Sequence, residues 1–140
     1  MKKTSLFLST LFVLSVLILS ACSGGTSASP TGEWKLVSYG DASNPTSALP
    51  DVETSINFNE DGTFGGSVGC NSLGADYKVD SDQITFGSIV STMMFCEGIS
   101  DQESAVLNIL TDKMVSFTVN GDQLTLTSAD GASVVVLARK

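Results

Sequence analysis

The sequence predicts an α+β domain in which a curved, mainly antiparallel β-sheet or partial barrel of about eight strands packs with a single α-helix. Two observations lead to this prediction. From Glu33 onward, short segments alternate apolar and polar residues, as strands with one buried face do. After Ser100, one segment changes to apolar spacings of three and four residues, which is typical of an amphipathic helix. Because such a helix has one apolar stripe, it needs a sheet to cover it.

The expected strands are separated by residues that favour tight turns. Asp61-Gly62, Asn120-Gly121 and Asp130-Gly131 can adopt the positive φ that tight hairpins require. We therefore expect three hairpins. The expected strands cover residues 34–39, 55–59, 63–68, 77–79, 83–86, 115–119, 123–127 and 133–138.

The expected helix has a clear beginning. Ser100 and Glu103 have the spacing of a capping box, in which the side chain of each residue accepts a hydrogen bond from the backbone N–H of the other. Asp101 adds a negative charge near the positive end of the helix dipole. The apolar stripe consists of Ala105, Val106, Ile109, Leu110 and Met114.

The first 21 residues have the pattern of an export signal. Lys2 and Lys3 precede an apolar stretch over residues 6–19, which is shorter than the about 20 apolar residues of a spanning helix. Leu19-Ser20-Ala21 then precede Cys22, in a pattern that resembles the bacterial lipoprotein box. We expect a lipoprotein signal peptide over residues 1–21 and acylation, such as palmitate, at Cys22. The alternatives are a soluble secreted form and an uncleaved anchor.

Residues 22–31 are expected to form the lipidated cysteine and a flexible tether. Residues 23–31 are small, polar and uncharged, and nine such residues reach roughly 15 to 18 Å as a random coil. The folded domain then covers residues 32–140. We expect it at the outer membrane facing the periplasm if the host has two membranes, and on the outer face of the plasma membrane if it has one.

The charge of the chain excludes one class of function. The full chain has 7 basic and 15 acidic residues and a net charge of −8. Loss of Lys2 and Lys3 with the signal peptide leaves 5 basic and 15 acidic residues, so the net charge becomes 5 minus 15, or −10. Such a surface repels nucleic acid and anionic headgroups. We therefore expect no nucleic-acid binding, and membrane attachment through acyl chains on Cys22.

Histidine is absent and only three cysteines are present, which excludes most familiar catalytic and zinc arrangements. We expect no enzyme activity, no cofactor and no metal. If Cys22 is acylated, Cys70 and Cys96 remain as a pair, for which a disulfide is the expected state in an oxidising compartment. A thiol redox site is the alternative, but the Cys-x-x-Cys spacing is missing.

Met93, Met94 and Cys96 form a soft-sulfur cluster in the sequence, of a kind that favours Cu(I). A disulfide would remove the best ligand of this cluster. Methionine often fills irregular gaps in a core. We therefore expect one or both methionines to pack beside Phe95, Ile99 and the helix.

Several short motifs follow one another in a specific order. They are Gly32-x-Trp34-x-Leu36, Phe58-x-x-Asp61-Gly62 with Gly66, Gly69-Cys70-Asn71 with Tyr77, Thr92-x-Met94-x-Cys96, and Glu103 before Leu107 and Leu110. This order resembles the META domain family that includes HslJ. The resemblance implies a small β-rich domain with one helix, found in envelope and stress or heat-shock proteins, and it implies no catalytic residues. The chain departs from the family at Leu73 and Phe95, where an aromatic residue and an alanine are usual.

Two functions are consistent with these observations. The first is a non-catalytic, lipid-anchored module of the cell envelope that binds another component or serves under stress, with an envelope protein of unknown identity as partner. The alternative is a carrier of a small apolar ligand, such as a lipid, with an internal pocket lined by Trp34, Phe58 and Met94. For the two aromatic residues, burial in the core is the favoured interpretation.

Overall fold

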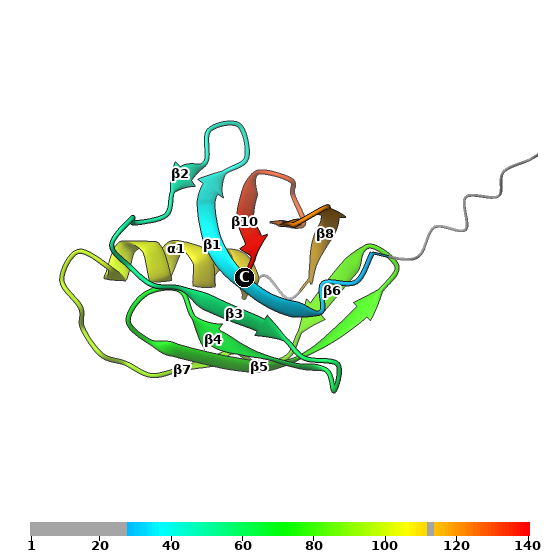
Figure 1. The fold of residues 1–140 in the computed structure, drawn as a ribbon, viewed down its shortest axis with the longest axis horizontal. Coiled ribbons are helices and arrows are strands. Elements are labelled where there is room, and N and C mark those ends of the chain that lie inside the picture. The colour runs from blue at the N-terminus through cyan, green and yellow to red at the C-terminus, as the bar shows by residue number, and fades with distance from the viewer. Residues whose placement is uncertain (1–27, 112–113) are drawn as a thin grey trace, which may run out of the picture.

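The computed structural model describes residues 28–111 and 114–140 (Figure 1). Within them, the chain forms ten strands and one helix. All eight expected strands are present, and the expected strand at 77–79 is the end of a longer one. The elements are β1 Gly32–Asp41, β2 Thr46–Ser47, β3 Ser55–Phe58, β4 Thr63–Ser67, β5 Ser72–Asp80, β6 Gln83–Phe86, β7 Val90–Ser91, α1 Ser100–Leu110, β8 Met114–Asn120, β9 Gln123–Thr127 and β10 Ser133–Arg139.

Eight of the strands close into an antiparallel barrel. Their order is β10-β9-β8-β6-β5-β4-β3-β1, and β1 pairs with β10 to complete the ring. Closure satisfies the backbone groups that an open sheet would leave at its edges. The short strands β2 and β7 add to β1 and β5 outside this ring. The predicted α+β class, with about eight strands and one helix, is confirmed.

The three predicted hairpins are also confirmed. They join β3 to β4, β8 to β9 and β9 to β10, and Gly62, Gly121 and Gly131 have φ values of 83°, 59° and 74°. A fourth hairpin joins β5 to β6 through Ser81 and Asp82. This hairpin is not one of the three predicted ones, since Ser81 adopts a φ of 57° that serine rarely takes.

The barrel is filled by the inward-facing side chains of its strands. Four aromatic rings pack together with centroids 5.0 to 6.2 Å apart, in pairs that are tilted or edge-on. They belong to Phe58, Phe64, Tyr77 and Phe86. The helix α1 lies against β1, β8 and β10, and its Val106 and Leu110 are fully buried (Figure 1).

The helix begins at Ser100, as expected, but the predicted capping box is wrong. The N-cap residue is Ile99, and no side chain caps the helix. The Ser100 hydroxyl donates instead to the carbonyl of Cys96 at 3.0 Å. Glu103 is turned toward the barrel, where backbone N–H groups of another segment bind it. Met114, expected on the apolar stripe, is the first residue of β8.

The described chain begins close to the barrel wall. Pro30 is buried, and its carbonyl accepts a hydrogen bond from the Trp34 indole N–H at 2.7 Å. The Arg139 guanidinium covers the Trp34 ring, with 4.2 Å from Cζ to the ring centroid. Two residues that the sequence assigned to the tether, Pro30 and Thr31, therefore lie next to the folded domain.

The predicted signal peptide and Cys22 lie outside the described residues. Among the residues that are described, no helix has the length and apolar character needed to cross a bilayer.

Candidate functional site

The carboxylate of Glu103 is the centre of a buried polar cluster. This residue is 4% exposed, and its Oε1 accepts the backbone N–H groups of Cys70, at 2.7 Å, and of Asn71. Its Oε2 accepts Asn71 Nδ2 at 2.8 Å. Hydrogen bonds to an ionised acceptor are stronger than neutral ones. The first turn of α1 therefore holds the Gly69–Asn71 segment in place.

Asn71 connects this segment to the loop after β7. Its Nδ2 donates to the Met94 carbonyl at 3.0 Å, and its Oδ1 accepts the Met94 N–H at 2.8 Å. The same Oδ1 accepts the Thr92 hydroxyl at 2.8 Å. The side-chain amide of Asn71 thus makes the pair of hydrogen bonds to Met94 that the backbone of a neighbouring strand would make. These bonds determine where residues 92–94 lie.

A disulfide joins Cys70 and Cys96 in the structure, with their Cα atoms 6.2 Å apart. It links the same two segments that Asn71 connects. A cross-link over 26 residues of sequence reduces the entropy of the unfolded chain, which stabilises the fold by about 3.5 kcal/mol in the chain-entropy model. The loop is therefore attached by a covalent bond and by hydrogen bonds.

Gly69 and Gln102 allow the helix to pack closely against the barrel at this cluster. A Cβ atom at Gly69 would lie 3.0 Å from Glu103 Cγ and would overlap Ile99 Cγ2, so only glycine lets the helix approach. Gln102, which is fully buried, accepts the Leu49 N–H at 2.8 Å and donates to the Val68 carbonyl at 2.6 Å. The buried side chains of Gln102 and Glu103 therefore both have hydrogen-bond partners inside the fold.

The cluster holds an exposed apolar segment, which we call the apolar loop and which consists of Met93, Met94 and Phe95. Their exposed fractions are 97%, 58% and 85%. The expectation that a methionine packs in the core beside the helix is wrong. Asn71 fixes the backbone of Met94 at the surface, and the space under the helix is already filled by other side chains.

A shallow hollow adjoins the apolar loop. Its volume is about 360 Å³, and it is lined by the first residues of β5 and by β7 and Thr92. Val90 of β7 is 67% exposed at its border. Loop and hollow together form a continuous surface with apolar side chains, of the kind that marks an interaction site when it is held in a fixed shape.

The three residues expected to line a ligand pocket lie in separate surroundings. Trp34 and Phe58 are fully buried in the core. Trp34 lies under Arg139, whereas Phe58 packs against other aromatic rings. Met94 is more than half exposed, on the loop. Core side chains fill the interior of the barrel. Trp34, Phe58 and Met94 therefore do not enclose a common ligand pocket.

The acidic and sulfur-containing residues of the described chain are the candidate ligands of a metal centre. Among the described residues, no group of three or more His, Cys, Asp or Glu side chains is placed to hold an ion. Cys96 is in the disulfide, which leaves no thiolate beside the two methionines. Asp61 accepts the Thr63 hydroxyl and N–H at 2.6 and 3.0 Å in its turn, and these bonds lower the pKa of Asp61.

The closed barrel with one packed helix defines a class of small β-rich domains. The META domain family model matches residues 27–140. The chain therefore belongs to the META domain family, as the motif order predicted. No curated protein is significantly similar to it.

Solved structures share this fold at low sequence identity. An NMR structure of a protein from Burkholderia xenovorans is 20% identical, with a TM-score of 0.64, over 78% of this chain and 81% of that one. A crystal structure of a DUF4847 family protein from Bacteroides vulgatus is 16% identical, with a TM-score of 0.59, over 79% and 93% of the two chains. At these identities the likeness concerns the fold alone.

The roles of Asn71 and Glu103 were not found from the sequence. The motifs that contain Asn71 and Met94 do not fit the alternation of a strand, and Glu103 was assigned to a capping box. The structure brings these motifs together, although more than 20 residues separate Asn71 from Met94. The signal for the site was therefore visible, but the pairing of its members depends on tertiary structure.

Proposed function

We propose that the chain is a non-catalytic binding module of the cell envelope, attached to a membrane by acyl chains on Cys22. The observation that carries this proposal is the apolar loop, in which Met93 and Phe95 are almost fully exposed on a backbone fixed by Asn71 and Cys96. A domain of this size rarely keeps large apolar side chains in water unless they meet a partner.

The polar cluster supports a binding role better than a catalytic one. The Glu103 carboxylate and the Asn71 amide are both engaged in hydrogen bonds within the fold, so neither has a free position for a substrate. Their arrangement keeps the loop in one conformation. The filled core likewise favours a binding module over the carrier alternative, because Trp34 and Phe58 already have protein neighbours.

The anchoring part of the proposal depends on Leu19-Ser20-Ala21-Cys22 and on charge. With a net charge of −10 after cleavage, the domain as a whole is repelled by anionic lipid. Acyl chains supply the attachment instead. The module would then face the periplasm from the outer membrane in a host with two membranes, and the exterior in a host with one.

Fractionation of cells that make the full chain tests the anchor. The wild-type protein should sediment with membranes and dissolve only in detergent, and its first tryptic peptide should begin at an acylated Cys22. The Cys22→Ala variant should lose the acyl mass. A wild-type protein that is found without acylation, in the soluble fraction, would contradict the proposal.

A native mass spectrum of the released domain separates the binding module from the carrier. We expect the mass of the polypeptide with its disulfide and no additional lipid. A retained lipid of defined mass would favour the carrier. The stress association implied by the family resemblance is tested separately, by the amount of the protein before and after heat shock.

A further inference from the structure

We propose that the apolar loop, with Val90 and the adjoining hollow, is the docking surface for another envelope protein, whose contact site is an apolar groove bordered by Lys or Arg. This inference rests on the proposed function as a binding module and names its surface and the chemistry of its partner. Four features of the described residues support it: the fixed backbone, the side-chain types, the charges and the position of the loop.

The backbone of the loop is fixed before any partner arrives. Asn71 bonds to both backbone groups of Met94, and the Thr92 N–H donates to the Ser72 carbonyl at 3.1 Å. The disulfide holds Cys96 at the other end. A loop held at these points loses little conformational entropy when it binds, which favours affinity.

The side chains of the loop are those that protein interfaces prefer. Methionine and phenylalanine are enriched at interfaces, and the flexible thioether of Met93 adapts to the shape of a groove. A protruding loop of three such residues fits a concave apolar site better than a flat one. The hollow lined by Leu73 and Val90 can accept a side chain from the partner in return.

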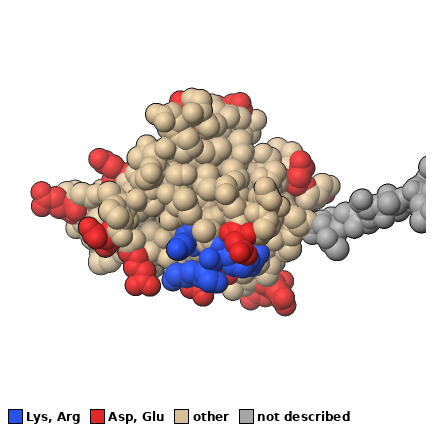
Figure 2. Space-filling view, turned by 45° about the horizontal axis from the view of Figure 1, so that its top comes forward, with Lys and Arg blue, Asp and Glu red and all other residues tan. Residues whose placement is uncertain are grey.

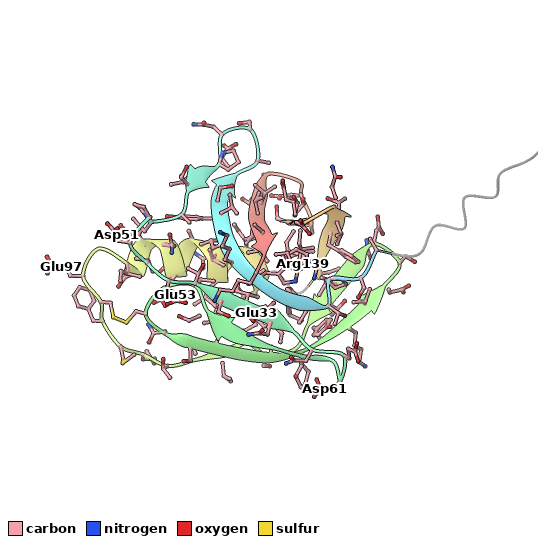
Figure 3. The ribbon with its side chains drawn as sticks, viewed as in Figure 1. Glu33, Asp51, Glu53, Asp61, Glu97 and Arg139 are labelled. Atoms are coloured by element: carbon pink, nitrogen blue, oxygen red, sulfur yellow. A yellow bond between two sulfur atoms is a disulfide. The ribbon has the colours of Figure 1, made fainter. Side chains whose placement is uncertain are left out.

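The surroundings of the loop are acidic. Glu97 follows the loop after Cys96, and Asp101 is exposed in the first turn of α1. Figure 3 places Asp51 and Glu97 at the end of the molecule where α1 begins. The basic side chains visible in Figure 2 gather in one patch. Among the basic residues, Lys140 pairs with Glu33 at 3.3 Å. A partner with a basic border is therefore complementary, whereas an anionic bilayer is repelled.

The loop also lies far from the point where the tether joins the domain. Ala28 lies against Ser81 and Asp82 in the hairpin that ends β5, whereas Asn71 and the loop lie at the beginning of β5. The nine residues of β5 separate these points by about 25 Å, and Figure 1 shows them at opposite ends of the molecule. The tether therefore joins the domain at the end opposite the loop, which leaves the loop accessible to another protein.

Site-specific photocrosslinking in intact cells tests the proposal with the full chain. The photoreactive residue p-benzoylphenylalanine replaces Phe95, and a matched control carries it at Val79, which is exposed at the other end of β5. Tandem mass spectrometry then identifies the adduct and the residue to which it is attached. A urea melt of each variant shows that the domain is folded.

We expect a protein adduct from position 95, attached within an apolar segment flanked by Lys or Arg, and none from position 79. Its yield should fall at least about tenfold when Met93→Ser is added, and it should also fall with Glu97→Lys, which reverses one rim charge.

Other results would overturn the inference in different ways. A protein adduct from position 79 alone would leave the binding module intact but would place its surface elsewhere. A lipid adduct from position 95 would identify the bilayer as the occupant. If neither position gives a protein adduct while the protein is found in the membrane, the inference and the binding role are both overturned. The proposed acyl anchor would still stand.

Discussion

The side chain of Asn71 bonds to both backbone polar groups of Met94, although the two residues are 23 positions apart in the sequence. The Met94 N–H donates to Asn71 Oδ1 at 2.8 Å, and Asn71 Nδ2 donates to the Met94 carbonyl at 3.0 Å. The second hydrogen of Nδ2 goes to Glu103. One side chain therefore couples the helix to the apolar loop, so a change at Asn71 should affect both stability and loop order.

The Asn71→Ala variant should lose about 2 to 3 kcal/mol of unfolding free energy, because it leaves several buried partners without hydrogen bonds. Urea unfolding measures this loss. Asn59→Ala is the control, since the side chain of Asn59 makes an exposed bond to Thr63, and its loss should be below about 1 kcal/mol. Equal losses in the two variants would contradict the proposed role of Asn71.

Replacing Glu103 with glutamine should also destabilise the fold, by about 2 kcal/mol. The new amide NH₂ group faces another donor in either orientation, either the N–H groups of Cys70 and Asn71 or the Nδ2 group of Asn71. Glu60→Gln, in an exposed turn, should change stability by less than about 0.5 kcal/mol. An E103Q variant as stable as the wild type would show that the charge is not needed there.

Gly69→Ala should cost about 1 to 3 kcal/mol, because the added methyl group would meet Ile99 and Glu103 and push the helix away from the barrel. Gly74→Ala is a matched control in β5, where the new Cβ would have only an ordinary contact with Val90 at 3.8 Å. Thermal unfolding compares the two variants. A smaller shift for G69A than for G74A would argue against close packing at this turn.

Stability should fall in acid, because hydrogen bonds from neighbouring hydroxyl and N–H groups lower the pKa of Asp61 and of Asp130 below the ordinary value of 3.8. A carboxyl with a lower pKa in the folded state stabilises the fold above its unfolded pKa and loses this effect as pH falls through the folded pKa. The unfolding free energy should therefore be level from about pH 7 to 5 and should decrease below about pH 4.

Two threonine variants test the source of this acid dependence. Thr63→Val removes the hydroxyl that donates to Asp61 and should reduce the slope below pH 4. Thr118→Val, at an exposed position of β8, is the control and should leave the slope unchanged. Urea melts at each pH measure the slope. An acid slope in T63V equal to that of the wild type would exclude this hydrogen bond as its source.

Most of the barrel could be predicted from the sequence because its signals are local. Alternation with a period of two and the Gly62, Gly121 and Gly131 turns identified the strands and three hairpins. The first half of β5 was missed, since Gly74 and Ala75 carry too little side chain to show alternation. The strands β2 and β7 have two residues each, which is too short for any period to appear.

The polar cluster could not be predicted, because its bonds join distant segments. Ser100 and Glu103 had the spacing of a capping box, but the N–H groups of Cys70 and Asn71 took the Glu103 carboxylate instead. On residue type alone, one or both of Met93 and Met94 were assigned to the core, and Met94 was also assigned to a possible ligand pocket. Their exposure follows from the tertiary contacts of Asn71, which no local pattern contains.

The measurement that tests the central claim most directly is hydrogen exchange at the backbone amide of Met94 in the folded domain, read by NMR. We predict that this amide is protected, with an exchange rate within about tenfold of the amides in β5, although its side chain is more than half exposed. Asn71→Ala should remove the protection. An amide that exchanges as fast as an unstructured peptide in the wild-type protein would contradict a fixed apolar loop and the docking surface inferred from it.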